Sequence, residues 1–255
     1  MTKESNLILC AAPERMDAAL ALSEQLGLPI SEAPAAGQLC LRLDTDGLHL
    51  QRDNLSLLGD FTALLPRLRP NALNGEMLVR AARIKGFEGT PAAIDATAGM
   101  GEDALLLAAA GFSVTLCERN PVIAALLRDT MERASFSPAL HEIVGRMTLH
   151  AGDSMELLRT LDQAPEVVLL DPMFPERRKS GLIGKKLQLL QQLEAPCSDE
   201  AELLEAAVAA GPKKVVIKRP LKGPFLADRK PAYSIRGKAV RYDCIVPPQH
   251  VKSEN

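Results

Sequence analysis

A carboxylate and two ring-shaped side chains follow a short apolar run in the second half of the chain. Asp171, Pro172 and Phe174 come directly after the run at 167–170. A short aliphatic run bounded by prolines is typical of a buried strand of a parallel sheet. Ligands of open α/β sheets bind outside the carboxyl ends of the strands, so Asp171 and Phe174 are expected at a reaction crevice. The motif indicates chemistry on an exocyclic amine. The alternative is that Asp-Pro only turns the chain and Phe174 fills the core.

Two glycines with one residue between them follow an earlier apolar run. Residues 92–95 predict a strand, Gly99 and Gly101 a tight turn, and residues 102–110 a helix. Glycine lets the backbone approach a ligand with no Cβ in the way, and the start of a helix presents free amides. The pattern predicts a nucleotide-type site. It is half of a dinucleotide fingerprint, because Ala104 stands where the third glycine would be.

Acidic residues follow three of the predicted strands in this region. Asp95 ends the first strand, and Glu118 ends the strand at 113–117, 17 residues after Gly101. That interval is near the roughly 20 residues at which an acid binds ribose hydroxyls. Asp153-Ser154 follows the strand at 147–150 and suits an adenine amino group. Each acid alone is better explained as a helix cap or a loop residue, but their positions at successive strand ends predict one shared site.

Helices alternate with these strands, as in a wound α/β sheet. Asn120-Pro121 predicts the start of one crossover helix, and another is expected between residues 198 and 211. A strand at 214–218 follows it. Runs at 232–235 and 240–246 predict a terminal hairpin, which gives the sheet an antiparallel edge.

Residues 1–70 contain short apolar runs broken by proline and glycine, and we expect them to form a small α+β cap before a larger domain at 71–255. The expected elements of the cap are strands at 7–10, 39–43 and 48–50 and a helix at 13–26.

Composition excludes several classes of protein. A chain of 255 residues with 47% hydrophobic content can bury a full core. Its five cysteines are odd in number and scattered, and its four histidines lack ligand spacing, so neither a disulfide framework nor a metal site is expected. The polar first six residues lead into no long apolar segment, which indicates a cytoplasmic protein with no membrane span.

These motifs together resemble those of class I S-adenosylmethionine (SAM)-dependent methyltransferases, and more narrowly the bacterial RsmJ family. The resemblance covers about residues 70–245, where the matching segments are Asp95-Ala-Thr-Ala-Gly-Met-Gly101, Glu118-Arg-Asn-Pro121, Leu170-Asp-Pro-Met-Phe-Pro175 and Val216-Ile-Lys-Arg-Pro220. Met173 departs from the commoner Asp-Pro-Pro-Phe form of the amine-methylating motif. The resemblance implies a Rossmann-like class I fold, with a mostly parallel seven-stranded sheet and an antiparallel C-terminal hairpin.

The resemblance also implies a reaction and the residues that perform it. The family methylates guanine N2 in 16S (small-subunit) ribosomal RNA with SAM, releasing S-adenosylhomocysteine. The implied catalytic residues are Asp171, Pro172 and Phe174. The implied cofactor-binding residues are Asp95, Gly99, Gly101, Glu102, Cys117, Glu118, Asp153, Ser154 and Asp171. The substrate expected is 16S rRNA, within the small ribosomal subunit.

Positive charge is concentrated in one part of the chain, which agrees with an RNA substrate. Residues 1–175 hold 14 Lys and Arg against 23 Asp and Glu, whereas residues 176–241 hold 15 against 7. Basic residues near a site attract a polyanion and release its counterions. For Lys213-Lys214 we prefer a solvated face. The residues expected to bind the substrate are Phe174, Arg177, Arg178, Lys179, Lys218 and Arg219.

Several alternatives remain open at this level. The Asp-Pro-x-Phe motif also serves adenine N6 and protein glutamine, so the guanine target rests on the resemblance alone. A nicotinamide-dependent dehydrogenase is favoured by the two glycines and Glu118, but the third glycine is absent. A non-catalytic RNA-binding scaffold is favoured by the basic segments, whereas intact Asp171 and Phe174 argue against it.

Overall fold

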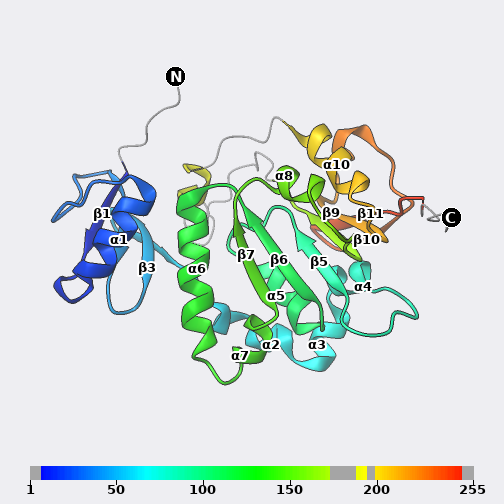
Figure 1. Cartoon of the computed structure of the whole chain (residues 1–255), viewed down its shortest axis with the longest axis horizontal. Coiled ribbons are helices and arrows are strands. Elements are labelled where there is room, and N and C mark those ends of the chain that lie inside the picture. The colour runs from blue at the N-terminus through cyan, green and yellow to red at the C-terminus, as the bar shows by residue number, and fades with distance from the viewer. Residues whose placement is uncertain (1–6, 173–187, 194–198, 249–255) are drawn as a thin grey trace.

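The structure of the chain, a computed structural model, describes residues 7–172, 188–193 and 199–248 (Figure 1). Seven strands form the larger sheet, in the order β10-β11-β9-β8-β5-β6-β7. These strands are β5 (Ala92–Asp95), β6 (Ser113–Glu118), β7 (Met147–Ala151), β8 (Val167–Leu170), β9 (Lys214–Pro220), β10 (Tyr233–Arg236) and β11 (Val240–Ile245). Strands β5 to β9 are parallel, and β11 is antiparallel to both β9 and β10. The predicted mostly parallel sheet with an antiparallel C-terminal hairpin is confirmed.

Helices cover both faces of this sheet, because its central strands are apolar on both sides. All four residues of β8 are buried. Val167 and Leu169 pack in the cluster that contains the helices of one face, and Val168 and Leu170 pack with those of the other face. The first face carries α4 (Met77–Ala82), α5 (Glu102–Ala109), α6 (Pro121–Ser135) and α7 (His141–Val144), and the second carries α8 (Ser154–Arg159) and α10 (Glu200–Ala209).

Two of the predicted helices begin and end close to the expected residues. The Asn120 side chain accepts hydrogen bonds from the backbone N–H groups of Val122 (3.0 Å) and Ile123 (3.2 Å), so it caps α6 as predicted. Helix α10 follows Asp199 and ends before Gly211, which has a φ of +71°. Both helices link parallel strands, as the β-helix-β alternation requires.

A second, four-stranded sheet precedes the larger one and has the order β1-β2-β3-β4. Its elements are β1 (Ile8–Ala11), a 3₁₀ turn η1 (Pro13–Arg15), α1 (Met16–Leu26), β2 (Leu39–Leu43), β3 (Leu48–Arg52) and β4 (Leu55–Leu58). The predicted β2–β3 hairpin is confirmed. Strand β4 was not predicted, because it is a four-residue edge strand whose leucines are only half-buried and do not alternate strictly.

The small sheet packs against α6, which stands between the two sheets (Figure 1). Leu41, Leu48 and Leu50 share one apolar cluster with Ile123 and Leu126 of that helix. The connection to β5 contains η2 (Phe61–Leu64), α2 (Leu65–Leu68), α3 (Pro70–Gly75) and α4.

The division of the chain at residue 70 stays a prediction. Phe61 and Leu64, which precede residue 70, already pack in the core of the larger sheet. Within the described ranges, no helix combines the length and the apolar character needed to cross a membrane.

Candidate active site

Four acidic residues stand at the carboxyl ends of neighbouring parallel strands. Asp95 and Glu118 are the last residues of β5 and β6, Asp153 follows β7, and Asp171 follows β8. The chain leaves β5 for β6 on one side and later returns to β8 on the other side. Strands β5 and β8 therefore flank the point where the strand order reverses, which is where open α/β sheets bind their ligands.

The two glycines of the turn after β5 have different structural roles. Both adopt a left-handed conformation, with φ of +53° at Gly99 and +77° at Gly101. A Cβ on Gly99 would meet no atom of the described residues within 4 Å, so within that part of the chain this backbone faces open space. A Cβ on Gly101 would lie 2.7 Å from Cδ1 of Leu127. Only Gly99 thus fits the expectation of close approach to a ligand, whereas Gly101 allows α5 to pack against α6.

Glu118 is fixed beside this turn with both carboxylate oxygens engaged. Its Oε2 accepts the Gly99 N–H (2.9 Å), and its Oε1 accepts the Asn120 N–H (2.8 Å). Burial raises the pKa of Glu118, and these N–H groups oppose that effect. Each oxygen can accept one further hydrogen bond, so the carboxylate suits the paired hydroxyls of a ribose.

The loop after β7 combines a helix cap with a position at the site. Asp153 accepts the Met155 N–H (2.7 Å) and so caps α8, which is the alternative considered for each acid. The Gly152 N–H donates to the Glu118 carbonyl (3.0 Å), which fixes the loop to the end of β6. Ser154 is buried at the first turn of α8. Capping and a place in the site are therefore compatible.

Asp95 lies beneath the turn with only 2% of its surface exposed. Its Oδ1 accepts the backbone N–H of Thr97 (3.2 Å). Burial, followed by the nearby charge of Asp103, raises the pKa of Asp95 to about 8.

Asp171 is held at its backbone and at its side chain by different elements. Its N–H donates to Oγ1 of Thr97 (2.6 Å), in the turn that follows β5. Its carboxylate lies 2.9 Å from Nζ of Lys218 on β9, and the same Nζ lies 2.7 Å from the carboxylate of Asp103. Lys218, expected to bind the substrate, is thus placed between two acids of the site. Pro172 is buried next to Asp171.

Two further arginines of the basic region, Arg219 and Arg241, are buried. Arg219, expected to bind the substrate, is 1% exposed, and its Nε donates to the Pro224 carbonyl (3.0 Å). Residues 218 and 219 are neighbours on a strand, so their side chains point to opposite faces of the sheet. Arg219 therefore faces α10, where its guanidinium lies 3.8 Å from Glu200, and its expected role in substrate binding stays a prediction.

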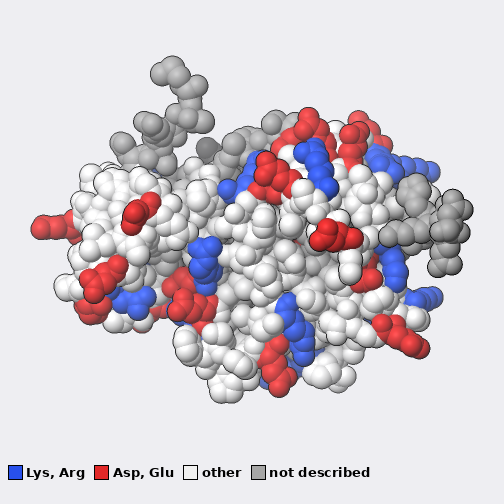
Figure 2. Space-filling view, viewed as in Figure 1, with Lys and Arg blue, Asp and Glu red and all other residues white. Residues whose placement is uncertain are grey.

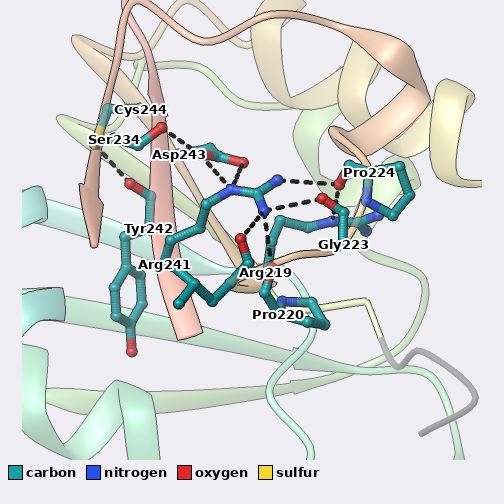
Figure 3. Close-up of polar contacts among 10 residues, drawn as sticks. Arg219, Pro220, Gly223, Pro224, Ser234, Arg241, Tyr242, Asp243 and Cys244 are labelled. Carbon is teal, nitrogen blue, oxygen red and sulfur yellow. Dashed lines mark hydrogen bonds and ion pairs between the residues drawn. The ribbon is translucent and has the colours of Figure 1, made fainter. Parts of the chain in front are cut away.

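Arg241 on β11 is the last residue of the basic region at 176–241, and its side chain is buried. It is 4% exposed, and its Nε donates to both carboxylate oxygens of Asp243 (3.0 Å each) (Figure 3). Its terminal nitrogens donate to four backbone carbonyls at the end of β9 and in the segment after it, at 2.8–3.1 Å. These carbonyls belong to Pro220, Leu221, Gly223 and Pro224. Arg241 shapes the loop that leaves β9.

Lys213 and Lys214, which were expected on a solvated face, are both only partly exposed. The Lys214 ammonium donates to the carbonyls of Ala81 (3.2 Å) and Arg83 (2.6 Å), and burial lowers its pKa. Lys213 lies over the Phe87 ring at 4.2 Å. Both lysines fasten β9 to the segment around α4.

Two residues expected to bind the cofactor differ in exposure: the Cys117 side chain lies in the core and Glu102 lies at the surface. The Cys117 side chain is buried in the core, where burial and Asp95 raise its pKa to about 12, and its carbonyl accepts the Ala98 N–H (3.0 Å). Glu102 is exposed in the first turn of α5. Four residues expected to be catalytic or substrate-binding lie outside the described residues: Phe174, Arg177, Arg178 and Lys179.

Sequence reasoning assigned no role to Thr97, Asp103 or Tyr242, which the structure places at the site. Tyr242 pairs with Lys218 across β11 and β9, and burial raises its pKa. Asp103 offered one local signal, since it is a second acid in the first turn of α5. Its partner Lys218 is 115 residues away, so no local pattern could have paired them. Among the described residues, no cluster of three or more His, Cys, Asp and Glu side chains could hold a metal ion.

Comparisons with known proteins agree with this geometry. The family described as "Putative SAM-dependent methyltransferase" matches residues 21–247. Ribosomal RNA small subunit methyltransferase J of Thioalkalivibrio sulfidiphilus is 41% identical over 244 residues, covering 92% of this chain and 95% of that protein. The protein of the same name from Dechloromonas aromatica is 40% identical over 248 residues, covering 94% and 99%. The crystal structure of a SAM-dependent methyltransferase from Neisseria gonorrhoeae has a TM-score of 0.75 and 30% identity, covering 94% and 95%.

The strand order, the glycine turn and these matches define a SAM-dependent methyltransferase with a class I fold, so SAM is its cofactor. This class removes the dehydrogenase alternative. More narrowly, the chain belongs to the family named Ribosomal RNA small subunit methyltransferase J, which confirms the resemblance to the RsmJ family.

Proposed function

We propose that this protein methylates the exocyclic N2 amine of a guanosine in 16S rRNA, with the small ribosomal subunit as its partner. The observation that carries the proposal is the position of Asp171 and Pro172 at the end of β8, where the Asp171 N–H donates to Oγ1 of Thr97 in the turn that leads to Gly99. The names of the relatives support small-subunit rRNA as the substrate. The choice of guanine N2 rests on the family resemblance of the motif.

The residues at the strand ends fit the cofactor. The turn from Asp95 to Gly101 would hold its methionine part, Glu118 its ribose hydroxyls, and Asp153-Ser154 its adenine side. Bound SAM supplies a methyl group activated by a positive sulfur, so the protein's main contribution is to place the amine correctly.

Asp171 and Pro172 would provide the acceptors for that amine. The lone pair of a base amine is delocalised into the ring, and acceptors for its two protons help the nitrogen rehybridise as it bonds to carbon. The Asp171 carboxylate and the Pro172 carbonyl are of the right chemistry and are adjacent. The nitrogen gains a methyl group and gives up one proton. A base in a duplex hides this amine, so the target is single-stranded or flipped out, and Phe174 would stack on it.

Exposed basic residues lie on the C-terminal side of the site and suit the RNA backbone. Lys222, Arg236 and Lys238 are exposed. Val240 pairs with Pro220, so the turn between β10 and β11 lies at the same sheet edge as the end of β9. Figure 2 shows Lys and Arg side chains along the end of the molecule where this hairpin lies. Among the described residues, none of the three takes part in an ion pair, so their charge is available for phosphates.

The test uses SAM with a radiolabelled methyl group and small ribosomal subunits that lack the modification. After incubation the RNA is digested and the labelled nucleoside is identified. We expect label in N2-methylguanosine, its loss with Asp171→Ala, and its retention with Asp162→Ala, an exposed aspartate in the loop before β8. Label in N6-methyladenosine or in protein would identify one of the other amines. No transfer, while S-adenosylhomocysteine still binds, would favour the scaffold alternative.

A further inference from the structure

Lys218 connects the acid of the amine-methylating motif to the helix that follows the glycine turn. Its ammonium lies 2.9 Å from Asp171 and 2.7 Å from Asp103. The side chains form a gradient of exposure, 17% for Asp103, 27% for Lys218 and 37% for Asp171. Asp103, the least exposed of the three, is largely shielded from water, whereas Asp171, the most exposed, reaches the place where a substrate would bind.

The ammonium stays charged in this position. Burial alone would lower the pKa of Lys218, but the charges of Asp103 and Asp171 outweigh burial and raise it well above its usual range. Asp103 is therefore more than a helix-terminal acid. It holds the lysine in place from the side opposite to Asp171.

The charge of Lys218 also acts on Asp171. A cation within 4–6 Å of a carboxylate favours its ionised form, whereas nearby acids disfavour it. Among the described residues, the charged or titratable groups whose electrostatics involve Asp171 are Asp95 on β5, Asp103 on α5, Lys218 on β9 and Tyr242 on β11, with Arg219 on the other face of β9. Lys218 is the only cation of this group in ion-pair contact with Asp171 among the described residues. The ammonium of Lys218 therefore opposes the effect of the neighbouring Asp103 charge on the Asp171 carboxylate.

The backbone of Asp171 is fixed independently, through the turn that we assign to the cofactor. Its N–H donates to Oγ1 of Thr97 (2.6 Å), and the N–H of Thr97 donates to Asp95 (3.2 Å). Asp171 is thus attached to the cofactor side of the site by its main chain and to β9 by its carboxylate. A displacement of about 1 Å between reacting groups can lower a rate about 100-fold, so such attachment has a direct kinetic consequence.

We propose that Lys218, held by Asp103, is a positioning residue that fixes Asp171 as an ionised hydrogen-bond acceptor for the substrate amine. The inference rests on the proposed function, because it needs an amine that binds Asp171. A carboxylate paired with an ammonium is a weak base, so Asp171 orients the amine. The proton that the nitrogen gives up as the N–CH₃ bond forms and the S–CH₃ bond breaks then passes to solvent water.

The experiment measures methyl transfer to small-subunit RNA by wild type, Lys218→Met and Lys218→Arg, with kcat followed from pH 5.5 to 9. Lys218→Met is expected to lower kcat about 10- to 100-fold at neutral pH. It should also move the acidic limb of the kcat profile to higher pH. Lys218→Arg, which keeps the charge, should restore most of the profile. The Kd of S-adenosylhomocysteine, from calorimetry, should stay within about threefold, because Lys218 contacts acids on the amine side of the turn.

Lys214→Met provides a matched control. Lys214 lies on the same strand and is also partly buried, but it binds the carbonyls of Ala81 and Arg83. This variant should melt at a lower temperature with the acidic limb of kcat unchanged. Asp103→Asn keeps the shape of Asp103 and should move the limb in the same direction as Lys218→Met, by less. It also serves if Lys218→Met does not fold.

Each result bears on the inference separately from the proposed function. An unchanged pH profile in Lys218→Met, the same shift in Lys214→Met, or an equal loss of kcat and of cofactor affinity would overturn the positioning role. Wild type that binds S-adenosylhomocysteine but transfers no methyl group to RNA would overturn the proposed function.

Discussion

Replacing Gly101 by alanine should destabilise the fold, whereas the same change at Gly99 should mainly affect the cofactor. At Gly101 the new Cβ would lie 2.7 Å from Leu127 Cδ1 and 3.3 Å from atoms of Leu116 and Phe61. The left-handed backbone costs a residue with a Cβ roughly 1–2 kcal/mol. Overpacking costs a further 1–3 kcal/mol or so. We therefore expect Gly101→Ala to lower the free energy of unfolding by about 2–5 kcal/mol, or about 4–20 °C in Tm for a chain of this size.

At Gly99 only the backbone contribution applies. Its φ of +53° is also left-handed, but among the residues that the structure describes no atom would lie within 4 Å of the added Cβ. The expected loss is about 1–2 kcal/mol. The methyl group would occupy the open side of the turn, where the cofactor is expected. A ligand present at 100 times its Kd stabilises a protein by about 2.7 kcal/mol, and Gly99→Ala should lose most of that effect.

The assay is urea unfolding followed by circular dichroism, together with melting in the presence and absence of S-adenosylhomocysteine. Gly86→Ala is the matched control, because Gly86 lies between α4 and β5 with a φ of +68°, and a Cβ added there would also meet no atom within 4 Å. It should lose the same 1–2 kcal/mol or so as Gly99→Ala and keep the full ligand response. The reasoning is refuted if Gly101→Ala is no less stable than Gly86→Ala, or if Gly99→Ala keeps that response.

Three further substitutions test the burial and capping described above. The raised pKa of Asp95, about 8 against 3.8 in the unfolded chain, means that its contribution to stability is full below pH 3.8 and is lost as pH rises toward 8. Urea unfolding without cofactor should therefore show that the free energy of unfolding falls less between pH 6 and pH 8.5 in Asp95→Asn than in wild type. Equal falls in the two proteins would contradict the raised pKa of Asp95. Asn120→Ala removes the α6 cap and a hydrogen bond to the Leu193 carbonyl (2.7 Å), so chemical denaturation should show a loss of about 1–2 kcal/mol, with Asn120→Asp retaining the cap. Arg241→Lys keeps the charge but cannot reach four carbonyls and Asp243 at once, and calorimetric melting should show a loss of about 3–5 kcal/mol; an unchanged Tm would show that water replaces these contacts.

The signals that predicted the fold and much of the site are local in the sequence. A short apolar run that ends in an acid or a glycine turn is visible within about ten residues, and the sheet places such strand ends together. Asn120-Pro121 is similarly local, and its capping role is confirmed. These features do not depend on tertiary contacts, so the sequence was sufficient to predict them.

The surroundings of the basic residues required the structure. Lys218 and Arg219 are adjacent in the sequence and looked alike, but the alternation of a strand sends one to the site and the other to the core. Strand periodicity could have separated them, although it could not have said which face carries the acids. The burial of Arg241 depends on carbonyls 17–21 residues earlier in the chain, and no spacing rule predicts such contacts.

The contacts of Arg241 have a consequence for the order in which the protein folds. The four carbonyls at the end of β9 and in the loop after it are bound by a side chain that belongs to β11, and β11 pairs with β9 itself. These carbonyls precede Arg241 by 17–21 residues, and the contacts that shape the loop form only when β11 pairs with β9. The parallel strands β5 to β9 can therefore assemble first. The edge of the site next to β9 acquires its shape only when β11 docks, so a chain that stops before residue 241 would carry the cofactor turn without a finished edge for the substrate.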